Sequence, residues 1–208
     1  MTQLLDFQKY MFAKLSHKSA IDVIYLDVSK AFDSVSHRRL LVQLDSMGIR
    51  GNLHRWLASY LSNRTQIVRV GDSVSSSCHV KSGVPQGSCL GPLLFLIYIT
   101  GIELCLKHSQ LLIYADDCKL YISDDQIDYA AKLQLDLLSV SDWLKHRQLS
   151  LSASKSVVAH IGKQNKRAAY QLDGQLIQSS SMVRDLGLYI SMDLKASSHI
   201  DIIRKRSL

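Results

Sequence analysis

Two apolar segments that meet at a pair of aspartates constrain this chain most. Residues 111–115 run directly into Asp116 and Asp117, and strand-forming residues resume at 119–122. Apolar runs of this length on either side of turn-forming residues are typical of a β-hairpin. We therefore predict a hairpin that carries two carboxylates at its tip.

A second buried strand is predicted over residues 21–28, which are rich in β-branched and aromatic side chains and include Asp27. If this strand lies beside the hairpin, Asp27 comes close to Asp116. Crowded like charges disfavour joint ionisation, and a bound dication removes that penalty. Carboxylate oxygens suit Mg²⁺, and two ions about 3.5–4 Å apart support in-line displacement at phosphorus. The alternative is that Asp116 and Asp117 are only turn residues, because aspartate hydrogen-bonds nearby backbone.

Helices are predicted where apolar residues recur at helical spacing. The first follows a cap at Ser34 or Ser36 and closes at Gly48, and the others cover residues 53–61, 90–102 and 127–146. In the second helix the expected apolar face consists of Leu53, Trp56, Leu57, Tyr60 and Leu61. The apolar part of 90–102 is far shorter than the roughly 20 residues that span a bilayer, so we expect a buried helix there.

Further strands and the fold class follow from the remaining patterns. Short strands are predicted at 66–70, 78–80, 149–151, 157–161 and 183–190, and a hairpin at 170–177 around Asp173 and Gly174. Strands and helices mix without a regular βαβ rhythm, so we predict an α+β fold. No repeat or interdomain linker is evident, which favours a single domain.

The composition is that of an ordinary globular chain. Of 208 residues, 47% are hydrophobic and 21% charged, which argues against disorder and collagen-like repeats. The net charge of +7 favours a polyanion such as nucleic acid or an acidic membrane surface. Four scattered cysteines predict free, buried thiols in a reducing compartment. The first residues lack the pattern of a signal peptide, so we expect an intracellular protein.

Five motifs follow one another between residues 21 and 190. They read YLDVSKAFDSVSH (25–37), GVPQGSCLGP (83–92), YADD (114–117), LSLSASK (149–155) and VRDLGL (183–188). Together they resemble the reverse transcriptases of non-LTR (LINE-like) retrotransposons, particularly jockey-like elements. The resemblance covers nearly the whole chain and implies a reverse transcriptase palm, an antiparallel sheet with packed helices, plus part of the fingers. In this layout 1–20 is a lead-in helix, 21–190 the palm with a finger insertion, and 191–208 the start of the thumb connection.

The same resemblance implies roles for the acidic residues. Asp27 and Asp116 match the ligands of two Mg²⁺ or Mn²⁺ ions, with the Val28 carbonyl assisting, and Asp117 is expected near the primer end. Lys155 matches a basic residue that neutralises or protonates the leaving pyrophosphate. A solvated surface lysine is the alternative for Lys155.

Nucleotide and template contacts are implied by the first two motifs. Phe32 matches an aromatic residue that packs under the nucleotide sugar, with a core aromatic as the alternative. Pro85, Gln86 and Gly87 lie in the segment expected to contact nucleotide and template, where a glycine lets the backbone approach closely. For Asp33 we predict a structural role as cap of the following helix.

Leu186 and Gly187 are expected to form the primer-grip turn. The chain departs from the family pattern at Cys89, where valine is common, and at Thr100 and Gly101, where Asn-Asp is usual. The finger motifs that grip the triphosphate, the thumb and an endonuclease segment are expected to be missing. These gaps leave open whether this chain alone is an active polymerase.

The implied partners are an RNA template, a DNA primer and deoxynucleotides, without a membrane, together with the rest of a retrotransposon polyprotein in the full element. Some of the basic residues are expected to contact the nucleic-acid backbone. The candidates are Arg38, Arg39, Arg50, Arg55, Arg64, Arg69, Lys163, Lys166 and Arg167. Two alternatives stay open: a nucleic-acid-binding remnant without activity, and a reverse transcriptase of the group II intron type.

Overall fold

The computed structural model describes residues 2–194, 200 and 203–204, and the chain forms two compact units. The first unit consists of Met1–Val28, Ile102–Trp143 and Ser150–Leu208, and the second of Ser29–Gly101 and Leu144–Leu149. Much of the expected thumb connection at 191–208, including Lys205 and Arg206, lies outside the described residues. Each unit mixes helices with antiparallel strands, so the fold is α+β, as predicted.

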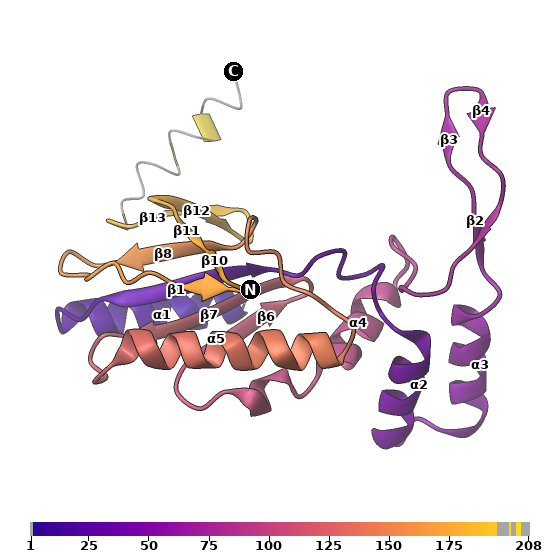
Figure 1. Ribbon diagram of the computed structural model, residues 1–208, viewed down its shortest axis with the longest axis horizontal. Helices are drawn as coiled ribbons and strands as arrows, with labels where there is room; N and C mark the ends of the chain where they lie inside the picture. The colour runs from indigo at the N-terminus through magenta and orange to yellow at the C-terminus, as the bar shows by residue number, and fades with distance from the viewer. Residues whose placement is uncertain (1, 195–199, 201–202, 205–208) are drawn as a thin grey trace. The chain divides into compact units, whose positions relative to one another are not determined.

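A five-stranded sheet forms the centre of the first unit, in the order β11-β8-β1-β7-β6 (Figure 1). All neighbouring strands are antiparallel except β8 and β11. The strands are β1 (Ile21–Asp27), β6 (Gln110–Tyr114), β7 (Asp117–Ser123), β8 (Val157–Ile161) and β11 (Gln178–Ser179). The predicted strand at 21–28 and the predicted acidic hairpin are therefore confirmed as neighbours in one sheet.

Both faces of β1 are covered, which explains its nearly continuous apolar sequence. Helix α1 (Thr2–Ser16) covers one face, where Phe7 and Met11 pack with Ile21 and Val23 in a buried cluster. Helix α5 (Tyr129–His146), predicted over 127–146, runs along the sheet in Figure 1. Its buried side chains include Leu133, Leu137 and Val140.

Two hairpins complete the first unit. The predicted hairpin around Asp173 and Gly174 is present as β9 (Gln171–Leu172) and β10 (Gln175–Leu176). The segment predicted as a strand at 183–190 forms two strands, divided by a turn at Leu186 and Gly187 where the resemblance implies one. The chain reverses at Leu186 and Gly187, whose φ angles are 46° and 91°, and forms β12 (Met182–Asp185) and β13 (Leu188–Ser191). The predicted strand at 149–151 is reduced to a single bridge between Leu151 and Val28.

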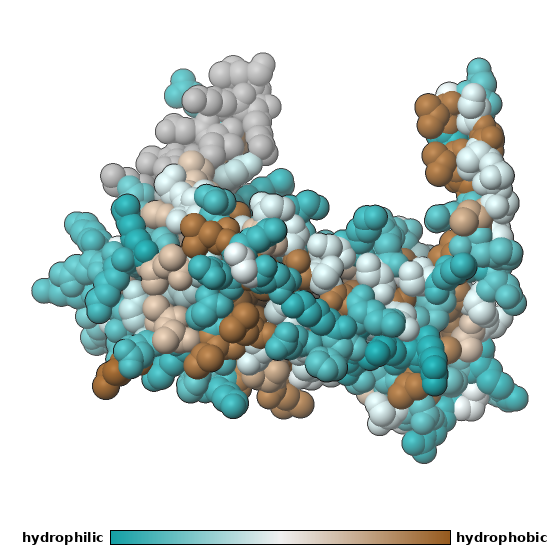
Figure 2. Space-filling model, in the orientation of Figure 1, coloured by the Kyte–Doolittle hydropathy of each residue, from teal (hydrophilic) through white to brown (hydrophobic). Residues whose placement is uncertain are grey.

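The second unit contains three helices and a long β-ribbon. The helices are α2 (His37–Ser46), α3 (Gly51–Leu61) and α4 (Gly91–Ile99), and a 3₁₀ turn (Ile102–Cys105) follows in the first unit. The ribbon consists of β2 (Thr65–Gln66), β3 (Arg69–Val70), β4 (Ser73–Val74) and β5 (Cys78–His79). Below the turn at Gly71 and Asp72 at its tip, the ribbon exposes the apolar side chains of Ile67, Val68, Val70 and Val74, seen as brown atoms in Figure 2. No described helix is long and apolar enough to cross a bilayer.

Three local expectations need correction. On α3, Leu57 and Leu61 are buried but Leu53 and Trp56 are exposed, because only one side of the predicted apolar face is covered. Ser36 precedes α2 but makes no side-chain cap hydrogen bond. All four cysteines are free, as predicted, yet only Cys118 is buried; Cys78 and Cys89 are exposed, since they lie in the ribbon and a loop.

Candidate active site

Asp27 and Asp117 lie directly opposite each other where β1 pairs with β7. Opposite residues of an antiparallel pair point to the same face, with Cβ atoms about 4.5–5.5 Å apart. The same register places Tyr25 opposite Lys119, two residues further from the hairpin tip. One face of the two strands therefore carries two carboxylates at its end and a Tyr-Lys pair next to them.

Asp116 lies in the turn of the β6–β7 hairpin. Tyr114 pairs with Asp117, so Ala115 and Asp116 form a two-residue turn, with Ala115 at φ 55°. A pocket of about 150 Å³ opens beside this turn. Its lining includes Asp27, Asp116 and Asp117, and also Val28 and Lys155. The structure thus gathers the five residues expected at the catalytic centre, which come from three separate segments of the chain.

The carboxylates act on one another electrostatically. Burial raises the pKa of Asp117, and the nearby carboxylates of Asp116, Asp185 and Asp27 raise it further, while Lys119 opposes them. Burial and the charges of Asp117 and Asp116 also raise the pKa of the Cys118 thiol, to about 12. Negative charge at this density attracts a cation.

The segment after the Leu151 bridge fixes Asp27 through its backbone. The Asp27 amide donates to Ser156 Oγ (3.2 Å), and the Asp27 carbonyl accepts from the Ser152 amide (2.9 Å). The acceptor of the Ser152 amide is thus the Asp27 carbonyl and not the neighbouring Val28 carbonyl, which was expected to assist metal binding. Lys155 belongs to the same segment, and its Nζ lies 3.9 Å from Asp27 Oδ1 with 69% of the side chain exposed. This segment therefore binds the backbone of Asp27 and leaves its side chain at the pocket. It also brings the long, positively charged side chain of Lys155 to the same pocket.

The oxygen donors fit a hard divalent ion. The described residues contain no group of three or more His, Cys, Asp or Glu side chains spaced to hold a metal by themselves. Mg²⁺ does not need such a cage, because it keeps several waters and takes one or two protein carboxylates plus substrate phosphates. Asp27 and Asp116 provide two carboxylates at the pocket, and Val28 also lines it.

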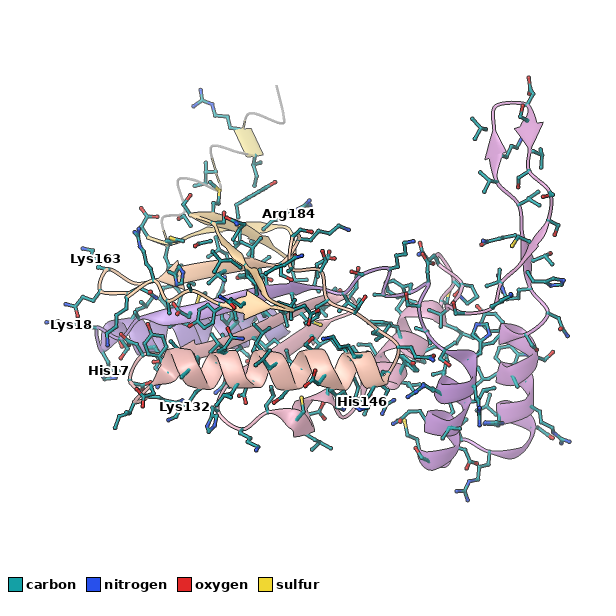
Figure 3. All side chains as sticks on the ribbon, in the orientation of Figure 1. His17, Lys18, Lys132, His146, Lys163 and Arg184 are labelled. Carbon is teal, nitrogen blue, oxygen red and sulfur yellow. The ribbon has the colours of Figure 1, made fainter. Side chains whose placement is uncertain are left out.

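Three further residues at the pocket received no individual role from the sequence. Lys119 and Asp185 form an ion pair, and the Tyr25 hydroxyl donates to the same Asp185 oxygen (3.4 Å). Arg184, labelled in Figure 3, and Leu186 also line the pocket from the β12–β13 hairpin. Tyr25 and Asp185 lie within the 25–37 and 183–188 motifs, and Lys119 is a single charged residue in an apolar strand next to the two aspartates.

The residues expected to contact nucleotide and template lie in the second unit. Gln86 Nε2 donates to Asp33 Oδ1 (2.9 Å), so the prediction that Asp33 caps a helix is wrong: its carboxylate binds the second motif instead. Asp33 and Gln86 line a pocket of about 770 Å³ with Pro85. Phe32 is half-buried, with its ring centre 5.1 Å from that of Phe95, a contact compatible with both predicted roles.

Gly83 joins the first two motifs through the backbone. Its amide donates to the Val35 carbonyl (2.8 Å), and the Val84 amide donates to the Phe32 carbonyl (2.7 Å). Gly83 has φ +94°, and a Cβ there would lie 2.8 Å from the Asp33 Cα. A glycine is therefore required for this close approach.

Comparison with known proteins decides the family. The profile described as "Reverse transcriptase (RNA-dependent DNA polymerase)" matches residues 2–190. The chain belongs to this reverse transcriptase family. Together with the relatives described next, this match confirms the predicted resemblance to non-LTR retrotransposon enzymes.

Curated relatives of this reverse transcriptase chain come from retrotransposons of Drosophila melanogaster. It is 26% identical to the "Probable RNA-directed DNA polymerase from transposon BS", over 98% of this chain and 24% of the relative. It is 30% identical to that of the transposon X-element, over 91% and 21%, and 28% identical to that of the mobile element jockey, over 87% and 21%. The chain thus spans about a quarter or less of the length of these relatives.

A solved structure of similar fold is telomerase from Candida tropicalis in complex with a fragment of telomeric RNA. The TM-score is 0.64 at 15% identity, covering 95% of this chain and 32% of that one. A second structure, the apo telomerase truncated from its C-terminal domain, gives 0.63 at 16% identity, over 93% and 38%. At this identity the likeness concerns the fold, and it agrees with a reverse transcriptase palm.

Proposed function

We propose that this chain is the palm region, with part of the fingers, of a retrotransposon reverse transcriptase that joins deoxynucleotides to a primer 3′-hydroxyl while copying RNA. The observation that carries the proposal is the register of β1 and β7, which brings Asp27 to the tip of the Asp116–Asp117 hairpin. Membership of the reverse transcriptase family supports the same chemistry.

Asp27 and Asp116 would hold two Mg²⁺ or Mn²⁺ ions, together with the Val28 carbonyl. Bound divalent ions supply activation of the primer hydroxyl and stabilisation of the departing oxygen. Asp117, opposite Asp27 in the register, would face the primer end. The exposed Lys155 ammonium would neutralise negative charge on the leaving pyrophosphate, and its contact with Asp27 places it at the same pocket.

The β12–β13 turn would support the primer terminus through Leu186 and Gly187. Leu186 lines the catalytic pocket, and the positive φ of Gly187 lets the backbone turn without strain. In the second unit, Phe32 would pack under the nucleotide sugar, and the 85–87 segment would contact the nucleotide and template.

The charge distribution supports a template contact in the second unit. That unit contains ten Lys and Arg residues against three Asp, a net charge of +7, whereas the first unit contains fifteen of each sign. The whole excess of the chain therefore lies in one unit. Six of the nine basic candidates belong to it, and Lys163, Lys166 and Arg167 belong to the first unit. Lys and Arg bind nucleic-acid phosphates by releasing condensed counterions.

Primer extension on an RNA template with Mg²⁺ tests the proposal. We expect incorporation by the wild-type chain and its loss, by at least a hundredfold, in Asp116→Ala and Asp117→Ala. Asp45→Asn is the matched control, because Asp45 is an exposed residue of α2 that pairs with Arg50. A chain that binds RNA in a salt-dependent way but incorporates nothing would be the inactive remnant, and incorporation unaffected by both alanine variants would contradict the assigned roles.

A further inference from the structure

Lys119 and Asp185 form an ion pair that is almost completely withdrawn from solvent. The distance from Lys119 Nζ to Asp185 Oδ2 is 2.5 Å, and the two side chains are 6% and 5% exposed. Lys119 Nζ also lies 4.5 Å from the centre of the Phe7 ring, a cation–π contact. Lysine and aspartate are seldom buried unless they are paired, so this contact organises its surroundings.

The ion pair joins two elements that do not share a sheet. Lys119 belongs to β7, and its side chain lies on the same face as Asp117, two residues earlier. Asp185 is the last residue of β12, directly before the turn at Leu186 and Gly187. Strands β12 and β13 pair only with each other and form a separate two-stranded sheet. The ion pair therefore connects the strand that carries a catalytic carboxylate with the turn assigned to the primer.

Apolar packing already holds the hairpin at another point. Val183 is buried in the cluster that contains Phe7, Met11 and Tyr121. This apolar contact attaches the hairpin to the sheet but does not fix its orientation, because hydrophobic packing is non-directional. A buried ion pair contributes little net stability relative to an apolar pair of similar size. What it adds is a short, directional contact, here reinforced by the Tyr25 hydroxyl on the same oxygen.

We propose that Lys119 and Asp185 are positioning residues that hold the β12–β13 turn at a fixed place beside Asp27 and Asp117. The inference rests on the proposed polymerase function. Misplacing a reacting group by about 1 Å can cost two orders of magnitude in rate. Loss of the ion pair therefore impairs handling of the primer–template. Binding of the incoming deoxynucleotide is spared, because its contacts were assigned to Phe32 and residues 85–87 of the second unit and to Asp27, Asp116 and Lys155, none of which belongs to the ion pair.

The decisive variant is the double replacement Lys119→Met/Asp185→Leu in the full chain. It fills the same space and leaves no buried charge unpaired, so we expect it to fold. The single variant Lys119→Met can fail to fold, because it leaves the buried Asp185 carboxylate without its cation. We expect its Tm to stay near that of the wild type. In primer extension we expect kcat to fall at least tenfold and KM for the primer–template to rise at least fivefold, with KM for the deoxynucleotide within twofold.

The matched control is Tyr170→Phe. Tyr170 donates to Asp22 within a buried network on the same sheet, away from the pocket, so this variant lowers Tm without touching the β12–β13 turn. Its ratio of the two KM values should equal that of the wild type. A double variant that extends primers like the wild type, or a control that shows the same KM split, would overturn the proposal.

Hydrogen exchange supplies a readout that needs no polymerase activity. In the double variant the amides of β12 and β13 should exchange at least tenfold faster than in the wild type, while those of β1 and β7 keep their protection. Unchanged exchange in the hairpin would contradict the proposal. If the wild-type chain does not extend primers, the polymerase function fails for this chain, and the exchange data still decide whether Lys119 and Asp185 hold the turn.

Discussion

Asp27 and Asp117 face each other across two antiparallel strands, at the end of the sheet where the β6–β7 hairpin turns. The 89 residues between them form most of the second unit and the first hairpin strand. Two carboxylates in this relationship repel each other, and the fold maintains them at the rim of a pocket.

Neutralising Asp117 should stabilise the metal-free protein at neutral pH. The folded-state pKa of Asp117 is raised by burial and by neighbouring carboxylates, so ionisation in the folded state costs more than in the unfolded chain. This cost is absent below the ordinary aspartate pKa of 3.8 and develops as pH rises through the raised value. We expect Asp117→Asn to raise Tm by about 2 °C at pH 7 and not at pH 3. A lower Tm at pH 7 would contradict this reading.

The buried network around Asp22 should be a major source of stability. Asp22 is completely buried and binds His160 Nδ1 (2.7 Å), Asn165 Nδ2 (2.7 Å) and the Tyr170 hydroxyl (2.5 Å). Replacing His160 by leucine leaves the buried Asp22 carboxylate without one of its hydrogen-bond partners. We expect His160→Leu to lower the unfolding free energy by about 1–3 kcal/mol in urea denaturation. His17→Leu, at the exposed end of the first helix region, should change it by less than about 0.5 kcal/mol.

Neighbouring leucines of α5 should differ sharply in their contribution. Leu137 is fully buried, whereas Leu138 is 43% exposed. We expect Leu137→Ala to lower the unfolding free energy by about 2–5 kcal/mol, because it leaves a cavity, and Leu138→Ala to cost less than about 1 kcal/mol. Equal effects of the two replacements in urea denaturation would show that α5 is rotated relative to the described packing.

Gly83 should be far less tolerant than another glycine with positive φ. A Cβ at Gly83 meets the Asp33 Cα at 2.8 Å, whereas nothing lies within 4 Å of one at Gly48, whose φ is +84°. We expect Gly48→Ala to cost about 1–2 kcal/mol, the strain of a left-handed residue, and Gly83→Ala clearly more. Amides of Phe32–Val35 should lose protection from hydrogen exchange only in Gly83→Ala. Similar losses in both variants would rule out the close backbone approach.

Local patterns were sufficient to predict the strand before Asp27, the acidic hairpin and the long helix α5. They could not predict the register that sets Asp27 against Asp117, because pairing over 89 residues depends on tertiary packing. Leu53 and Trp56 show the same limit: helical spacing defines an apolar face, but its width does not reveal which part is covered.

Long-range polar contacts were the part of the site that the sequence predicted least well. Lys119 is the one charged residue in the apolar run 118–122, and no local pattern indicates its partner Asp185, which lies 66 residues further on. Asp33 was assigned to a local cap for a similar reason, although its carboxylate accepts from Gln86, 53 residues away. The motifs predicted that Asp27, Asp116, Asp117 and Lys155 belong to one site, and these residues line one pocket, because a family resemblance carries long-range information that composition and periodicity lack.

Binding of Mn²⁺ tests the central claim most directly, because it measures whether the carboxylates share a divalent ion independently of catalysis. Free Mn²⁺ is counted by electron paramagnetic resonance during titration of the wild-type chain, Asp27→Asn, Asp116→Asn and the control Asp45→Asn. We predict that the wild type and Asp45→Asn bind Mn²⁺ equally and that Asp27→Asn and Asp116→Asn each weaken binding at least tenfold. Binding that is equally strong in all four chains would contradict the account.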